Sequence, residues 1–282
     1  MNHLAELLPI SLAVVLTAMV GVWLLSLALR NASIADPFWG MGFVTVAWFT
    51  LISVKGATGA PRVWLLVALT TIWGLRLSLY LLFRNWSHAE DRRYQAMRQH
   101  HGKRFWWVSL LTVFWLQGVI LWIVSMPIQV SALADAWAFE TQLAVSDPQY
   151  FESPLDAGHV LGWMDLVGLS VWFVGFVFET VGDYQMSRFR GDPANAGRVM
   201  DRGLWQYTRH PNYFGDFCIW WGIYLIAVAG GAAWTIFSPL LMSFLLLKVS
   251  GVSLLEKDIV YRRPEYAAYQ NRTSAFFPKI PR

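Results

Sequence analysis

The sequence has few charged residues and only one cysteine. Charged side chains make up 14% of its 282 residues, whereas a soluble domain carries roughly a quarter. The single cysteine, Cys218, excludes a disulfide framework and a thiolate metal site. No Gly-rich phosphate loop follows a strand pattern, which excludes Rossmann and P-loop domains. What is abundant is apolar: 56% of the residues are hydrophobic, which is typical of a membrane protein.

Long uncharged runs divide the chain into candidate membrane helices. Residues 8–29 form an uncharged run of 22 residues, and such a helix can cross about 30 Å of hydrocarbon. Further runs cover 38–54, 63–83, 105–130, 160–178, 214–233 and 234–247. Within these runs apolar residues follow one another and do not alternate with polar ones, as they would in the strands of a membrane barrel. The sequence therefore predicts an all-α, polytopic membrane protein with seven transmembrane helices, and with six as the alternative.

Basic residues are concentrated in three segments between these runs. Residues 84–104 contain six, 183–211 contain five and 257–282 contain six, whereas 131–159 contain none and five acidic residues. The positive-inside rule places the first three segments in the cytosol and the last outside. We therefore predict an external N-terminus, a cytosolic C-terminus and a short, irregular external loop near 131–160.

The most polar stretch, residues 179–216, lies directly beside a predicted span. It combines five arginines and four aspartates with His210 and Asn212. Spaced guanidinium groups can each bind phosphate oxygens in a bidentate way. A basic loop facing anionic lipid would explain the arginines, but it leaves the interleaved Asp, Asn, His and Tyr unexplained. The stretch therefore predicts a site for a ligand with several phosphates.

Within this stretch, DRGLWQYTRHPNYFGD resembles the C-terminal signature of the steroid 5-alpha-reductase family, particularly its bacterial branch. The resemblance covers residues 160–282 well and the upstream WGLRLSLYLLFRNW weakly. It implies a seven-helix, NADPH-dependent reductase of the bacterial inner membrane. It also implies one transmembrane domain, 1–282, with residues 1–130 on the substrate side and residues 160–282 as the cofactor-binding half.

The resemblance further implies which residues hold NADPH on the cytosolic side. The positions that match the family's cofactor-binding residues are Asp183, Arg190, Arg198, Asn212 and Asp216, the last being Glu in the reductases. Arg84 and Asn85 in the third span fall near positions that close over the cofactor. The other candidate cofactor-binding residues are Tyr207, Arg209, His210, Tyr213, Lys257 and Tyr261.

Two departures from the family bear on the substrate. Reductases of steroid enones carry a Gln-Glu pair opening the second span and a Tyr in the third. Here the sequence reads Ala35-Asp36-Pro37 and Ile72-Trp73-Gly74. A steroid itself is therefore not favoured, and we expect a hydrophobic lipid or steroid-like molecule with an activated C=C bond, reached from the bilayer. We expect membrane lipids as further partners. We expect no metal, no nucleic acid and no obligate protein partner.

Two side chains are the candidate catalytic residues. Hydride addition to the β-carbon of an enone builds negative charge on its carbonyl oxygen, which requires a hydrogen-bond donor in a dry site. Tyr80 and Asp36, kept neutral by desolvation, are the predicted donors. In the alternative interpretation, Asp36 precedes Pro37 and only caps the second span.

A second family shares part of the pattern. Arg209-His210-Pro211-x-Tyr213, Leu255-Glu256-Lys257 and Glu265-Tyr266-x-x-Tyr269 are similar to the isoprenylcysteine carboxyl methyltransferases, which bind S-adenosylmethionine. That ligand is a net cation, whereas NADPH is a polyanion, and the arginines favour NADPH. A membrane methyltransferase and a non-enzymatic membrane protein remain the alternatives.

Overall fold

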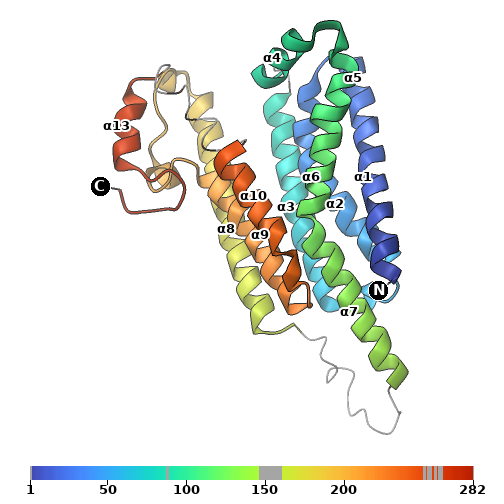
Figure 1. Cartoon of the computed structure of the whole chain (residues 1–282). Coiled ribbons are helices and arrows are strands. Elements are labelled where there is room, and N and C mark those ends of the chain that lie inside the picture. Colours follow the sequence, from blue (N-terminus) through green and yellow to red (C-terminus); the bar gives the residue numbers. More distant parts are fainter. Residues whose placement is uncertain are drawn as a thin grey trace. The chain divides into compact units, whose positions relative to one another are not determined.

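The computed structural model shows a helical chain (Figure 1). It describes residues 2–86, 89–145, 161–249, 252, 256, 259 and 263–281, and over these residues it contains helices and no strand. Two compact units divide the chain: Met1–Gly162 with Ala227–Thr235, and Trp163–Ile226 with Ile236–Arg282. Each unit is described by itself.

The first unit is a bundle of long helices (Figure 1). Its helices are α1 (Asn2–Leu29), α2 (Ala35–Ser53), α3 (Pro61–Asn85), α4 (Arg92–His101), α5 (Phe105–Ser109), α6 (Leu116–Val124) and α7 (Met126–Val145). Between α5 and α6, Leu110–Trp115 forms a π-helical segment.

The second unit is built around a pair of helices, α8 (Trp163–Gly191) and α9 (Pro211–Ala229), the last residues of α9 belonging to the first unit. It also contains α10 (Phe237–Phe244), a π-helical turn over Leu245–Val249, and α13 (Glu265–Arg272) near the C-terminus. Two 3-10 turns, Pro193–Asn195 and Gly203–Gln206, lie between α8 and α9.

Four helices of the described chain are long and apolar enough to cross a membrane. They are Leu4–Leu29, Pro61–Asn85, Arg92–Val124 and Trp163–Gly191. A helix also forms at the other three predicted runs, but these are less apolar or shorter: α2 begins with Asp36 and Pro37, α9 carries Asn212 and Asp216 in its first turns, and Ala233–Val249 is short. Membrane-type helical architecture is thus confirmed, and the count of seven spans stays a prediction.

Two predicted loops are partly helical. The predicted fifth span ends at 178, whereas α8 continues to Gly191, so Asp183 and Arg190 lie on a helix. The region expected to be an irregular loop from 131 is helical as far as Val145 in α7. In both segments the helix continues through polar residues. A high content of charged residues does not show where a helix ends, because most charged side chains are compatible with a helix.

Glycines allow two helix pairs to approach closely. In the first unit, a Cβ atom added to Gly40 of α2 would lie 2.4 Å from the carbonyl oxygen of Gly74 in α3. In the second unit, a Cβ added to Gly175 of α8 would lie 2.5 Å from the carbonyl oxygen of Gly215 in α9. Such distances are impossible for a real side chain, so only glycine permits these contacts. Small residues at helix crossings are a common means of association in membranes.

A buried ion pair joins α3 to α7. The Nη1 atom of Arg62 lies 2.7 Å from Oδ1 of Asp135, and the two residues are 6% and 5% exposed. Ser131 donates a hydrogen bond to the other carboxylate oxygen at 3.2 Å. The predicted topology puts Arg62 on the external side, where the positive-inside rule disfavours a basic residue. The ion pair neutralises its charge within the bundle.

We expect Asp135→Ala to lower the free energy of unfolding by about 3–5 kcal/mol, because it leaves the Arg62 charge buried without its carboxylate. The double variant Arg62→Met with Asp135→Leu should recover most of this loss, since neither charge remains. The free energy of unfolding of both variants is measured in mixed micelles with an increasing fraction of denaturing detergent. A double variant as unstable as the single one would contradict this account.

Candidate functional site

The segment after α8 folds back along the last turns of that helix. The indole of Trp205 donates to the carbonyl of Gly182 at 3.1 Å, and the Leu204 amide donates to the Gln185 side chain at 2.9 Å. Gly203 has a φ of 60°, a left-handed conformation that glycine adopts without strain. These contacts place the polar signature beside the end of a candidate membrane helix.

Asp183 and Asn212 meet where α8 and α9 come together. The Asn212 amide donates to Oδ1 of Asp183 at 3.3 Å, and Asp183 is only 5% exposed. Pro211, which starts α9, packs against Gly182, so the two polar residues are held at adjacent helix positions. The structure thus joins two of the predicted cofactor-binding residues.

Arg209 and His210 point to a different partner, Glu256. Arg209 donates to both oxygens of this carboxylate, at 2.7 and 2.8 Å, and Nε2 of His210 lies 3.0 Å from Oε1. Tyr266 and Gln270 each donate to it at 3.2 Å. We call these five residues the Glu256 cluster. Arg209 and His210 bind another part of the protein through this cluster.

Electrostatics keep the carboxylate of Glu256 ionised. Burial by itself disfavours the charged carboxylate, but hydrogen bonds from His210 and Arg209 outweigh it and lower the pKa of Glu256 to about 2. Burial and the neighbouring Glu256 charge raise the pKa of the Tyr266 phenol, which therefore keeps the proton it donates. The cluster is an ionised carboxylate surrounded by donors.

Four arginines near this site are exposed. Arg188 and Arg190 end α8, and Arg198 and Arg202 follow in the connecting segment. We call these four residues the arginine segment. Arg188 contacts the Tyr184 hydroxyl at 3.2 Å. Their side chains are exposed, so an anion can reach them from the solvent.

The remaining candidates of this half are placed as follows. Tyr213 stacks on His210, with ring centroids 5.6 Å apart and an interplanar angle of 10°. Asp216 lies one turn beyond Asn212 on α9 and is partly buried, whereas Tyr207 is 38% exposed. Lys257 and Tyr261 lie outside the residues that the structure describes.

The predicted catalytic residue Asp36 lies in a polar cluster of the first unit. Its carboxylate accepts hydrogen bonds from the Tyr94 hydroxyl at 2.6 Å and from Arg93 at 3.2 Å. Gln117 in turn donates to the Tyr94 oxygen at 3.3 Å. The alternative in which Asp36 caps the second span is wrong, because Ile34 is the N-cap of α2 and no side chain caps it. The Asp36 side chain instead ties α2 to α4.

Tyr80 sits between two cations on α3. The guanidinium carbons of Arg76 and Arg84 lie 5.5 and 5.6 Å from its ring centroid, and Arg84 donates to the Asn85 side chain at 3.2 Å. The contact of Gly40 with Gly74 brings the start of α2 and the end of α3 to the same end of the bundle. Asp36 and Tyr80 therefore share that end.

Sequence reasoning missed two residues that the site depends on. Tyr94 is only 5% exposed although it lies in a basic segment predicted to be cytosolic, and Glu256 was noticed only as part of a motif. A tyrosine among arginines carries no signal for burial. The carboxylate of Glu256 could have been found as the acceptor that two adjacent basic residues, Arg209 and His210, would need.

An all-helical membrane-type protein with a polar site at helix ends is thus defined, and comparison with known proteins places it in a family. The sequence matches the family described as "Protein of unknown function (DUF1295)" over residues 22–273, so the chain belongs to that family. It is 24% identical over 302 residues to an uncharacterized protein of Schizosaccharomyces pombe, an alignment that covers 96% of this chain and 80% of the relative. No solved structure matches.

The Glu256 cluster predicts a specific acid dependence. Because the pKa of Glu256 falls from 4.5 to about 2 on folding, the unfolded chain takes up the proton first as the pH is lowered. The stabilisation is therefore complete above about pH 4.5 and is lost progressively towards pH 2. In acid unfolding, Glu256→Gln should remove this component and lower stability near neutral pH. The exposed Glu265→Gln is the control, and an equal effect of both variants would refute the assignment.

Proposed function

We propose that the chain is an NADPH-dependent membrane reductase that transfers hydride to an activated C=C bond of a hydrophobic substrate. The observation that carries the proposal is the exposed arginine segment near the partly buried Asp183–Asn212 pair. A ligand with several phosphates needs several guanidinium groups that it can reach from the solvent. Arg188, Arg190, Arg198 and Arg202 have the exposure for this role.

The residues present suit the parts of NADPH. Arg190 and Arg198 would bind its phosphates, which carry most of its charge. Asp183 and Asn212 offer a carboxylate and an amide, groups that can bind ribose hydroxyls or a carboxamide. When bound, NADPH supplies the hydride. The protein's part is to orient it and to exclude water.

The protein must also stabilise the negative charge that develops on the substrate's carbonyl oxygen. We propose Tyr80 and the protonated form of Asp36 as the donors for this task, at their common end of the first unit. The Tyr94 hydroxyl, which donates to Asp36 at 2.6 Å, fixes the orientation of that carboxyl group. In a site shielded from water, a preorganised donor stabilises such a charge far more than it would in bulk solvent.

One observation favours the second candidate, an S-adenosylmethionine-dependent methyltransferase. The Glu256 cluster brings together Arg209, His210, Glu256 and Tyr266, the residues on which that resemblance rests. Their mutual hydrogen bonds already satisfy them, however, and a cationic cofactor gains nothing from the arginine segment. We therefore prefer the reductase.

Binding of the cofactor tests the arginine segment. Arg190→Ala and Arg198→Ala should each weaken NADPH binding by about 1–3 kcal/mol, through loss of charge-assisted bonds to phosphate. The effect should be smaller with NADH for an arginine that binds the 2′-phosphate. Titration calorimetry of the purified protein measures this, with Arg92→Ala, an exposed arginine of α4, as the matched control. Unchanged NADPH affinity in both variants would remove the arginine segment from the site.

Turnover tests the two catalytic candidates. Asp36→Asn keeps a donor but a far less acidic one, and Tyr80→Phe removes a single hydroxyl. Each should reduce turnover by roughly two orders of magnitude with little change in NADPH affinity. NADPH oxidation with a panel of hydrophobic enones identifies the substrate first and then provides the assay. Full activity in both variants would eliminate these two assignments and leave the cofactor site in place.

A further inference from the structure

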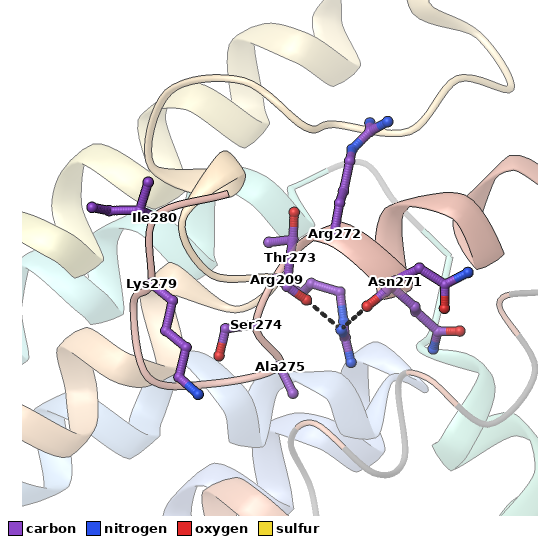
Figure 2. A pocket seen from close by; sticks show the side chains of 9 residues that line it. Arg209, Asn271, Arg272, Thr273, Ser274, Ala275, Lys279 and Ile280 are labelled. Atoms are coloured by element: carbon purple, nitrogen blue, oxygen red, sulfur yellow. Dashed lines mark hydrogen bonds between the residues drawn. The ribbon is translucent and has the colours of Figure 1, made fainter. Parts of the chain in front are cut away.

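The C-terminal segment of the second unit borders an open cavity that the proposed reaction does not use. Its volume is about 330 Å³. The residues lining it are Arg209, Gln270, Asn271, Arg272, Thr273, Ser274, Ala275, Lys279 and Ile280 (Figure 2). Most of the lining follows the end of α13, where the chain turns back towards Tyr207 and the Lys279 amide donates to the Tyr207 carbonyl at 2.9 Å.

The lining carries positive charge. Three of its side chains are cationic, and it contains no carboxylate. Arg209 is held by Glu256 and by the carbonyls of Gln270 and Thr273, and Figure 2 marks its carbonyl contacts as dashed lines. Arg272 pairs with Asp201 outside the cavity. Lys279 is exposed, and its ammonium group has no side-chain partner within the described part of the chain. Its charge, with the Ser274 hydroxyl in the same lining, is suited to an anion.

The same C-terminal segment carries two exposed apolar side chains, Ile280 and Phe277, which we call its apolar rim. Ile280 lines the cavity and is 86% exposed, and Phe277, nearby in the chain, is 53% exposed. The adjoining Phe276 is buried and contacts Phe217 of α9 edge to face, which anchors this segment to a membrane-type helix pair. A lysine flanked by exposed aromatic and aliphatic side chains is typical of a segment at the membrane–water interface.

We propose that this cavity binds the headgroup phosphate of an anionic phospholipid, with Ile280 and Phe277 inserted among the adjacent acyl chains. A soluble phosphate would use Lys279 and Ser274 but would leave the apolar rim in water. An anionic lipid satisfies the charge and covers the rim at once. Basic residues near a membrane surface gain affinity for such lipids in this way. The proposal does not depend on the identity of the cofactor.

Lipid binding to the purified full chain in detergent tests the proposal. Native mass spectrometry would follow titration with phosphatidylglycerol, and, in separate arms, with phosphatidylcholine and with inorganic phosphate. We expect phosphatidylglycerol to bind best. Lys279→Gln should weaken its binding about fivefold, the loss of one lysine contact. Ile280→Ser should weaken lipid binding without changing the response to inorganic phosphate. Lys103→Gln, an exposed lysine of the first unit, is the matched control and should have no effect.

Three outcomes would overturn the proposal. Equal losses of phosphatidylglycerol affinity in Lys279→Gln and Lys103→Gln would show that the lipid is attracted by positive charge in general and not by this cavity. Inorganic phosphate that competes fully with the lipid, together with no effect of Ile280→Ser, would identify a soluble phosphate as the ligand. A loss of NADPH affinity in Lys279→Gln, measured in parallel, would assign the cavity to the cofactor site. Failure of the reductase proposal alone would leave the lipid result unchanged.

Discussion

The close contact of α8 with α9 is the constraint on which the rest of the second unit depends. Gly175 and Gly215 let the two backbones touch, since a Cβ at either position would lie 2.5–2.6 Å from the other's carbonyl oxygen. In a bilayer, where apolar burial gives little driving force between helices, such packing and interhelical hydrogen bonds hold a pair together. The contact sets the register that brings Asp183 beside Asn212. The segment that connects the two helices carries Arg198 and Arg202, which are both exposed.

The Glu256 cluster divides the basic residues of the polar stretch 179–216 into two groups. Arg209 and His210 both contact the Glu256 carboxylate, and the Glu256 cluster ties the segment before α9 to α13. The arginine segment is exposed. An Arg-His-Pro motif that acts as a structural clamp is compatible with different cofactors. This explains in physical terms why the motif resembles reductases and methyltransferases alike, and why the charge of the exposed surface is the better guide to the ligand.

Much of the fold follows from local properties of the sequence, and most of the site does not. Each apolar run predicted a helix because its backbone has no other way to be satisfied in hydrocarbon. The extension of α8 to Gly191 was missed because a charged helical end and a charged loop have similar compositions. Asp183 and Asn212 are 29 positions apart. That they belong to one site was predicted from the family resemblance and not from any local pattern in the sequence. Contacts such as Tyr94 with Asp36 join segments 58 positions apart, and no periodicity encodes them.

The most direct test of the reductase assignment is a fluorescence titration of NADPH with the purified wild-type protein, beside calorimetric titration of S-adenosylmethionine. A hydrophobic, water-shielded site should enhance nicotinamide fluorescence in a saturable way. Affinity should fall with rising salt, because guanidinium–phosphate contacts on an exposed surface are screened. S-adenosylmethionine should show no heat of binding. Saturable binding of S-adenosylmethionine with no fluorescence change for NADPH would contradict the account and establish the methyltransferase alternative.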